Sequence, residues 1–279
     1  MLRLMSHNQW RCDDNLPDWE KRGLDCSASV RVRGFVRVFR DLMPDVIGCQ
    51  EVSPMMADKL IRYLAEDGLR YSLLWGRDTP IVYRPDKVEL IDSDFSVYPT
   101  KCPVYPGEFN NGLTKSWNLA VFRSKTSYRT FVFVSTHLWW MSEDPQNKHY
   151  QKGSDFARAF QLELAINKAK EFQQRYDCPV IIVGDFNANY DSIALKKAFA
   201  HGFTHAHDCA TDYKDETQGY HWCGPDGFEE YQNGGFRDAI DHIIIGNAEP
   251  NFVKQFQRYS PDYYLPLSDH SPVFIDAQL

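Results

Sequence analysis

The chain has 279 residues, of which 43% are hydrophobic and 25% charged, and this composition predicts an ordinary globular protein rather than a disordered one. Its formal charge of -7 counts against non-specific nucleic-acid binding, which depends on Lys and Arg neutralising phosphates, although a local basic groove is compatible with an acidic total. No apolar stretch approaches the roughly 20 residues of a membrane span, and the seven cysteines include no CxxC pair, which argues against a zinc-thiolate site.

Strand-like runs recur from the first residues onward. In chain order they cover residues 2–5, 46–49, 71–75, 81–83, 88–91, 119–122, 131–135, 180–183, 243–245 and 273–275. The dipeptide Pro85-Asp86 predicts a hairpin turn between the fourth and fifth runs. No signal peptide precedes the first run, so we expect a cytoplasmic protein, provided that no leader was removed.

Two segments carry apolar residues at helical spacing, over residues 30–42 and 156–176. Pro44 ends the first helix, and Ser154 and Asp155 are the expected N-caps of the second. The arginines of the first helix are interpreted as a solvated face; they are Arg31, Arg33, Arg37 and Arg40.

Strands outnumber helices, and only two links between strands are long enough for a crossover helix. This mixture predicts an α/β (α+β) protein with mixed sheets and outer helices, formed by one domain over residues 1–279. Three long polar segments, residues 9–28, 138–154 and 204–238, are expected to be functional or mobile loops.

The most informative segment is Gly184-Asp185-Phe186-Asn187, directly after the apolar run 180–183. The alternation of side chains along the strand predicts that Asp185 and Asn187 face the same side. Such a pair can bind a hard metal ion, orient water or hold a phosphoryl oxygen. The alternative is a simple turn at a strand end, because Asp and Asn also favour turns.

Other strand ends carry similar polar residues. Asn8, Glu51 and His137 follow strand-like runs, whereas Asp241 and the pair Asp269-His270 precede such runs. If the last two strands are antiparallel to the earlier ones, all these side chains meet at one rim. The sequence therefore predicts a single polar pocket, conditional on that strand direction.

At these positions the chain resembles the endonuclease/exonuclease/phosphatase superfamily, the DNase I-like metal-dependent phosphoesterases. The segments that carry the resemblance are Cys49-Gln50-Glu51, Ser135-Thr136-His137-Leu138, Gly184-Asp185-Phe186-Asn187, Ile240-Asp241-His242-Ile243 and Ser268-Asp269-His270. The resemblance implies a four-layer sandwich, in which two mixed β-sheets pack face to face with helices on the outside.

The resemblance also implies roles for these residues. Glu51 is the expected ligand of Mg²⁺, or of Mn²⁺, with support from Asn8 and from Asp269 on the other side. Asp185 would position or deprotonate the attacking water, and Asn187 would donate to a phosphoryl oxygen. His137 and His270 would flank the phosphate, His270 as an acid, a base or an electrostatic clamp, and Asp241 would orient His270.

Side chains near the rim have two interpretations each. Trp139, Trp140 and Trp222 either stack on a sugar or base or cover the core, and Arg158 either reaches the phosphate or forms a surface salt bridge. Strand alternation predicts that the neighbouring histidines pack away from the site; these are His7 and His242. A metal site at His205 and His207 is disfavoured, because no third ligand has suitable spacing.

The leading hypothesis is Mg²⁺-dependent hydrolysis of a phosphoester on a small or medium phosphorylated molecule, with sugar phosphates, lipid head groups and nucleotides all open as substrates. The second hypothesis is a DNA or RNA nuclease that uses the same residues. The third is a catalytically silent protein that binds a phosphorylated ligand.

Overall fold

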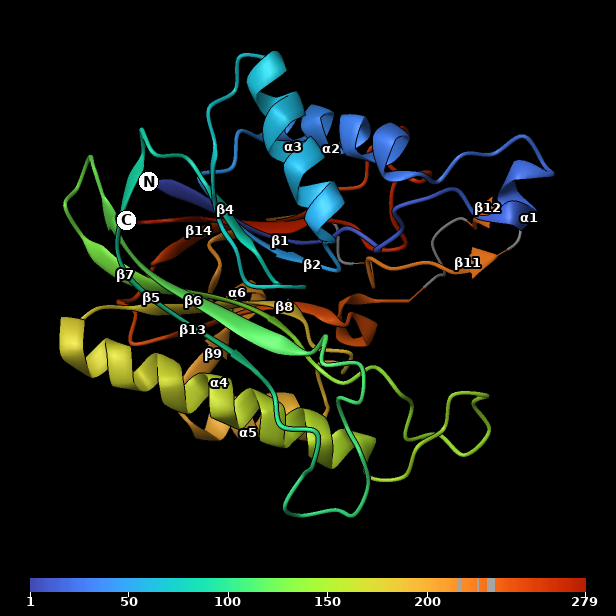
Figure 1. The fold of residues 1–279 in the computed structure, drawn as a ribbon. Helices are drawn as coiled ribbons and strands as arrows, with labels where there is room; N and C mark the ends of the chain where they lie inside the picture. Colours follow the sequence, from blue (N-terminus) through green and yellow to red (C-terminus); the bar gives the residue numbers. More distant parts are fainter. Residues whose placement is uncertain (215–216, 225, 230–233) are drawn as a thin grey trace.

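Two large mixed sheets pack face to face, with helices over both outer surfaces (Figure 1). The structure is a computed structural model that describes residues 1–214, 217–224, 226–229 and 234–279. Part of the expected loop at residues 204–238 therefore lies outside the described residues. The layered arrangement confirms the four-layer sandwich that the resemblance implied.

The first sheet has seven strands in the order β10-β14-β15-β1-β2-β4-β3. In that order the strands are β10 (Asp212–Lys214), β14 (Val253–Arg258), β15 (Val273–Ala277), β1 (Leu2–Asn8), β2 (Val46–Gln50), β4 (Ile81–Tyr83) and β3 (Ser72–Leu74).

The second sheet has six strands in the order β5-β6-β7-β8-β13-β9. They are β5 (Val88–Val97), β6 (Ser116–Ser124), β7 (Thr130–His137), β8 (Val180–Asp185), β13 (Asp241–Gly246) and β9 (Phe203–His205). A small separate hairpin joins β11 (Cys223–Gly224) to β12 (Gly227–Phe228).

Helices α2 (Ala28–Leu42) and α3 (Pro54–Glu66) cover the first sheet, and α4 (Ser154–Tyr176) and α5 (Ile193–Ala200) cover the second (Figure 1). Each helix pair buries an apolar core against its sheet, and a further core fills the space between the sheets. The short helices are α1 (Pro17–Glu20), α6 (Ala206–Cys209) and a 3₁₀ turn at Phe236–Asp238. Among the described residues, no helix has both the length and the apolar character to cross a membrane.

Strand direction satisfies the condition on which the predicted pocket depended. β1 is parallel to β2, and β7 is parallel to β8. β15 is antiparallel to β1, and β13 is antiparallel to β8 with Asp241 directly opposite Asp185. The ends of the early strands and the starts of the late strands therefore lie at the same rim.

The two sheets approach closely beneath this rim at Gly48. A Cβ on Gly48 would lie 2.5 Å from Val183 Cγ2 and 2.9 Å from Ser135 Cβ, so no larger residue fits without a shift of the opposite sheet. The Ser135 hydroxyl donates to the Cys49 carbonyl at 2.9 Å and accepts from Gln50 Nε2 at 3.1 Å. These buried bonds fix one sheet relative to the other directly below the polar rim.

The predicted hairpin at Pro85-Asp86 is wrong. β4 pairs with β2 and β3 in the first sheet, whereas β5 pairs with β6 in the second. The turn after Arg84 carries the chain from one sheet to the other. A local turn signal is the same for both arrangements, because it does not specify which strands pair.

Sequence patterns also missed two covering helices and one N-cap. Helix α3 begins with Pro54, and the Ser53 hydroxyl accepts from the Met56 amide at 3.1 Å, which is a regular capping arrangement. Helix α5 is capped in the same way by Ser192. The N-cap of α4 is Gly153 rather than the predicted Ser154 or Asp155.

The prediction that Arg31 lies on the solvated face of the first helix is wrong. Its side chain is fully buried, and its guanidinium donates to five backbone carbonyls. The acceptors are the carbonyls of Gln9, Trp10, Cys12, Cys26 and Leu267. Arg31 thus holds the loop of residues 9–28 against the body of the protein, while the other three arginines form exposed ion pairs as expected.

His7 and His242 pack away from the rim, as strand alternation predicted. His7 Nε2 lies 2.9 Å from the Tyr264 hydroxyl, and His242 Nε2 lies 2.7 Å from the Ala188 carbonyl. His205 Nε2 lies 3.0 Å from His242 Nδ1, so His205 belongs to this packing cluster rather than to a site with His207. Burial lowers the pKa of His7 to about 3 and that of His242 to about 4.

These buried histidines are expected to make the fold acid-sensitive. Their pKa values are lower in the folded state than in the unfolded state, so the unfolded chain binds more protons between pH 6.5 and 4. Stability is therefore complete above pH 6.5 and is lost as the pH falls, by on the order of 2 kcal/mol per histidine at pH 4.5. Urea unfolding at pH 7.5 and 4.5 measures this loss.

His242→Gln keeps a donor near the Ala188 carbonyl. It should reduce the difference between the free energies of unfolding at pH 7.5 and at pH 4.5. The exposed His149→Gln is the matched control and should leave that difference unchanged. An unaltered pH dependence in His242→Gln would contradict the assignment.

Candidate active site

A polar cavity of about 380 Å³ opens at the shared rim of the two sheets. Its lining residues come from strand ends and from the loops that follow them; they are Arg11, Glu51, Asp78, Thr114, Lys115, His137, Trp140, Asp185, Asn187, Asp269 and His270. Six of the eight predicted catalytic and metal-binding residues are in this lining. The other two, Asn8 and Asp241, are buried in contact with Asp185 and His270, respectively.

Asp185 lies at the centre of the group. Its Oδ2 accepts from Asn8 Nδ2 at 3.1 Å and lies 3.4 Å from His137 Nε2 and 4.0 Å from His270 Nε2. Burial by itself raises the pKa of this carboxyl, but the hydrogen bond from His137 and the positive charges of His270 and Lys115 lower it below its ordinary value. Asp185 is therefore an anion at neutral pH.

Asn187 reaches the cavity through a turn and not through strand alternation. β8 ends at Asp185, and Asn187 has a left-handed backbone with φ of 49°. Its amide donates to Asp185 Oδ1 at 2.8 Å, and its side-chain Nδ2 donates to the Leu138 carbonyl at 3.2 Å. The expected placement beside Asp185 is correct, but its physical cause is this tight turn.

His270 and Asp241 form a close buried pair, with 2.7 Å between Nδ1 and Oδ2. Burial lowers the pKa of His270, but the carboxylates of Asp241, Asp269 and Asp185 raise it well above its ordinary value. The imidazole is thus protonated at neutral pH. Its Nε2 side faces the Asp185 and Asp269 carboxylates, at 4.0 and 3.9 Å.

Three side chains form a potential metal-binding group: ligand atoms of Glu51, His137 and Asp185 all lie within 4.8 Å of one another. Asn8 Nδ2 lies 3.5 Å from Glu51 Oε1 and connects this group to β1. Burial and the negative charge of Glu51 raise the pKa of the nearby Asp269 carboxyl to about 7, against the opposing positive charge of His270. Such a concentration of carboxylate oxygens fits a hard divalent cation, which would neutralise their repulsion.

Lys115 is a buried member of the site that the sequence did not reveal. Its Nζ lies 2.5 Å from His137 Nε2, because β6 begins at Ser116, directly opposite His137 in the antiparallel register. Burial lowers the pKa of Lys115, and the carboxylates of Glu51, Asp185 and Asp78 act in the opposite direction. A lysine before an apolar strand has no distinguishing local pattern; only the pairing of β6 with β7 brings it here.

Asp78 and Arg11 are also additions to the predicted set. Asp78 Oδ2 lies 3.4 Å from His137 Nδ1, on a different ring nitrogen from the one that Asp185 approaches. Arg11 Nη1 forms an ion pair with Asp78 Oδ1 at 3.5 Å. Both residues come from loops whose sequences carry no periodic signal.

The predicted substrate-binding side chains have different surroundings. Trp140 lines the cavity and is 45% exposed, whereas Trp139 is buried in a small apolar cluster with Phe109. Trp222 is 52% exposed outside the cavity lining, with Lys148 Nζ 5.3 Å from its ring centre. Arg158 is buried and donates to backbone carbonyls of the loop at residues 138–154, at Trp139 and Met141.

Comparison with known proteins identifies the family. The profile of the Endonuclease/Exonuclease/phosphatase family matches residues 13–270. The chain belongs to this family. The family comprises hydrolytic phosphoesterases, and the carboxylate and histidine groups of the cavity are in keeping with that chemistry. No curated protein matches the chain.

Solved structures with the same fold match this chain over nearly their whole length. A mannosyl-6-phosphatase from Bacteroides thetaiotaomicron is 19% identical, with full coverage of both chains and a TM-score of 0.74. A family protein from the same species is 18% identical over 98% of this chain and 93% of its own, with a TM-score of 0.72. D. rerio TDP2, in complex with a single-strand DNA product, is 19% identical over 98% and 97% of the two chains, with a TM-score of 0.63.

Proposed function

We propose that this family member is a Mg²⁺-dependent phosphoesterase that hydrolyses a small or medium phosphorylated molecule. The observation that carries the proposal is that an anion and a cation lie close together at one cavity. Oδ2 of the anionic Asp185 lies 3.4 Å from His137 Nε2 and 4.0 Å from Nε2 of the protonated His270. A phosphoryl group needs this combination, because its attack requires a base for water and cations for its oxygens.

In the proposed reaction, Asp185 takes a proton from the attacking water as the water oxygen bonds to phosphorus. The ester P–O bond breaks, and the alcohol leaves with a proton that Asp185 returns through solvent. The protonated His270 donates from Nε2 to a phosphoryl oxygen, while Asp241 holds Nδ1–H and so fixes the ring orientation. Lys115 adds positive charge beside His137 at the base of the cavity.

Asn187 and the metal complete the assignment. The carboxamide of Asn187 donates to a phosphoryl oxygen once substrate displaces its bond to Leu138. Glu51 is the principal ligand of Mg²⁺, or of Mn²⁺, with Asn8 and Asp269 as supporting ligands. The bound cation would supply charge neutralisation on the phosphoryl oxygens and the leaving oxygen.

A substrate panel tests this function, with sugar phosphates, nucleotides, inositol phosphates, phosphodiesters and DNA. We expect hydrolysis of at least one phosphate ester that EDTA abolishes and Mg²⁺ restores. At the Mg²⁺ concentration that saturates the wild-type protein, Glu51→Gln should lower kcat/KM by about 10²-fold or more, since mutations at metal sites have effects of this size. The exposed Glu66→Gln on α3 is the matched control.

Two outcomes would contradict the proposal. Activity that is insensitive to both EDTA and Glu51→Gln would exclude the metal assignment. Complete inactivity across the panel, with Mg²⁺ and Mn²⁺ each supplied, would favour a silent protein that binds a phosphorylated ligand.

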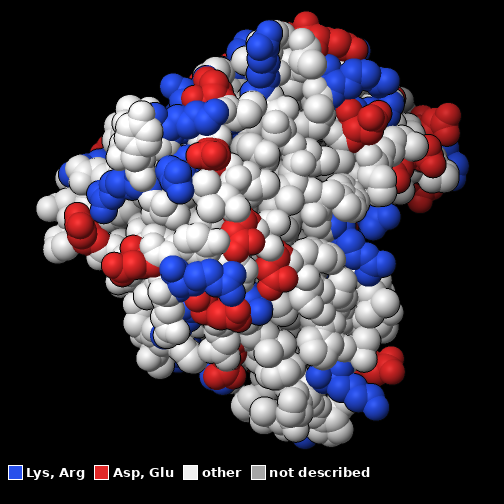
Figure 2. All heavy atoms as spheres, turned by 60° about the vertical axis from the view of Figure 1, so that its left-hand side comes forward, with Lys and Arg blue, Asp and Glu red and all other residues white. Residues whose placement is uncertain are grey.

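A nuclease using the same site is the second candidate, favoured by the likeness to TDP2 bound to its single-strand DNA product. Figure 2 shows the face on the left of Figure 1, at the strand ends opposite the rim, where Lys and Arg side chains are interspersed with Asp and Glu. A nuclease needs its basic surface beside the rim itself. Plasmid nicking at low salt with Mg²⁺, lost in Glu51→Ala, would favour the nuclease over the small-molecule enzyme.

A further inference from the structure

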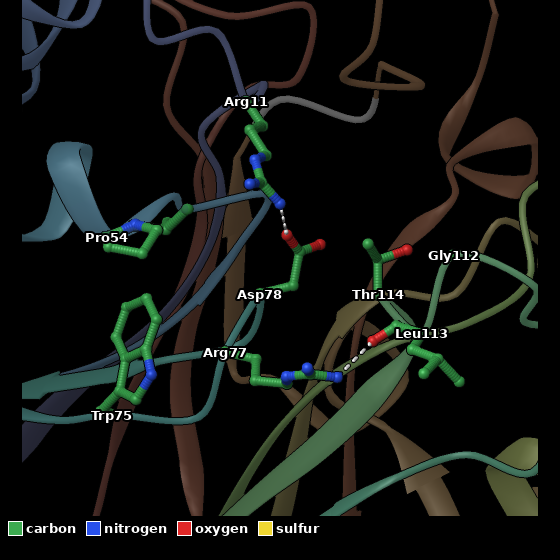
Figure 3. A pocket seen from close by; sticks show the side chains of 9 residues that line it. Arg11, Pro54, Trp75, Arg77, Asp78, Gly112, Leu113 and Thr114 are labelled. Atoms are coloured by element: carbon green, nitrogen blue, oxygen red, sulfur yellow. Dashed lines mark hydrogen bonds and ion pairs between the residues drawn. The ribbon is translucent and has the colours of Figure 1, made fainter.

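A second cavity of about 340 Å³ adjoins the catalytic one and shares Arg11, Asp78 and Thr114 with it (Figure 3). In Figure 3 Trp75 and Pro54 form one side, Leu113 lies on the opposite side, and Arg77 extends between them. A group bound here would therefore be continuous with a phosphoryl group in the catalytic cavity.

Asp78 shows which chemistry the second cavity accepts. The residue is only 5% exposed, and among the described residues its Oδ1 has no hydrogen-bond donor, since Arg11 at 3.5 Å forms an ion pair without hydrogen-bond geometry. A buried carboxylate oxygen without a donor is costly, so this oxygen favours a ligand that supplies an O–H or N–H group. It disfavours a second phosphate at the same place, because two anions would repel.

Trp75 and Arg77 provide the complementary surfaces. The Trp75 side chain is 42% exposed although it is large and apolar, and its indole lies in the cavity wall. Arg77 Nη1 donates to the Leu113 carbonyl at 3.2 Å, which leaves the other guanidinium N–H groups for a ligand. An aromatic face combined with adjacent donors and an acceptor suits a ring that has an apolar face and hydroxyls at its edge.

The position of the cavity relative to Asp185 points to the leaving alcohol. Asp78 and Asp185 approach different nitrogens of the His137 ring, so they lie around one imidazole in separate directions. In an in-line displacement the attacking and leaving oxygens are on opposite sides of phosphorus. With water at Asp185, the alcohol part of the substrate extends away from Asp185 and toward the second cavity.

We propose that this cavity is a ring subsite that binds the neutral, polyhydroxylated ring of a sugar phosphomonoester. The ring stacks on Trp75, one hydroxyl donates to Asp78 Oδ1, and neighbouring hydroxyls accept from Arg11 and Arg77. This inference rests on the proposed function and names the substrate class for the same catalytic cavity.

The test compares three kinds of phosphomonoester, all of them esters of primary alcohols with the same intrinsic leaving-group chemistry. The first kind is a set of hexose 6-phosphates, the second is glycerol 3-phosphate, and the third is a set of nucleoside 5′-monophosphates. Glycerol 3-phosphate has no ring. The wild-type protein with Mg²⁺ should prefer at least one hexose phosphate over glycerol 3-phosphate by roughly tenfold or more in kcat/KM. Trp75→Ala should remove roughly tenfold to a hundredfold of the hexose phosphate value, mainly through KM, and bring the ratio of the two substrates close to one.

Arg77→Gln should reduce the same ratio by about tenfold, since it removes donors to the hydroxyls without removing the aromatic face. Two exposed residues away from the cavity, Tyr128 and Arg62, provide the matched controls Tyr128→Ala and Arg62→Gln, which should keep the wild-type ratio. Thermal melting of each variant checks that the fold is retained.

The outcomes separate the subsite from the function itself. Hydrolysis of hexose phosphate and glycerol 3-phosphate with equal efficiency, unaffected by Trp75→Ala, would leave the phosphoesterase in place and overturn the ring subsite. A preference for nucleoside monophosphates that Trp75→Ala abolishes would make the cavity a base subsite and overturn the sugar assignment. Inactivity toward every ester of the wider panel would overturn both proposals.

Discussion

Replacing Asp185 by Asn is expected to lower kcat by about 10³- to 10⁴-fold while the protein stays folded. In the wild type the Asn187 amide donates to Asp185 Oδ1 at 2.8 Å. The carboxamide of the variant keeps an oxygen for this bond, but it cannot take a proton from water. It also removes the negative charge that faces His137 and His270. The measurement is steady-state kinetics on the best substrate of the panel, with circular dichroism and thermal melting as checks of the fold.

Asp191→Asn is the matched control, since Asp191 is an exposed aspartate that pairs with Arg237 on the surface. It should keep wild-type kcat and KM. Near-normal activity of Asp185→Asn on the true substrate would show that the attacking water is activated elsewhere, and the site assignment would be wrong. An effect confined to KM would instead limit Asp185 to substrate binding.

The second large effect is expected at the pair of Asp241 and His270. Asp241→Asn removes the anion 2.7 Å from His270 Nδ1 and should lower kcat by about 10³- to 10⁴-fold, as the loss of an orienting carboxylate does in comparable pairs. Asp241 also helps to raise the pKa of His270, so the variant should lose its imidazolium as the pH rises through neutrality. The residual kcat of the variant should therefore increase as the pH falls below neutrality. The kcat of the wild type should not change with the protonation of His270 over the same range, because its imidazole is already protonated.

A double variant tests whether the two residues act as one unit. His270→Ala combined with Asp241→Asn should be no slower than His270→Ala alone, because the carboxylate acts only through the ring that has been removed. Losses that add in the double variant would show that Asp241 has a separate function. The exposed Asp212→Asn on β10 serves as the control.

Local patterns were sufficient to locate most of the fold and of the site. Runs of β-branched residues identify β2, β7 and β8, because such side chains favour buried strands wherever they pair. The short run Leu2-Arg3-Leu4-Met5 indicates β1. Asn8, Glu51, His137 and Asp185 stand out because polar residues interrupt these runs abruptly. The late residues Asp241, Asp269 and His270 precede strand-like runs, so their place at the same rim depended on strand direction, and the antiparallel pairing of β13 and β15 meets that condition.

Other features depend on contacts between distant segments. The segment around Pro85 has a turn signal, but whether it joins two paired strands or crosses between sheets is decided by sheet packing. Arg31 has the helical spacing of a surface residue, yet it is buried because the loop of residues 9–28 supplies carbonyl acceptors that no sequence pattern reveals.

The sequence by itself indicated mixed sheets with outer helices and the polar residues at the strand ends, since each depends on residue types within a short segment. The family resemblance added the four-layer sandwich and the expectation of a phosphoester bond. Only the tertiary structure decided that Lys115 and Asp78 join His137 and that Asn187 reaches the cavity through a left-handed turn. It also placed Trp75 and Arg77 in a cavity beside the site. The physical reason is that these residues lie at the ends of strands or in loops, where register and sheet packing, rather than hydrophobic periodicity, set the position of a side chain.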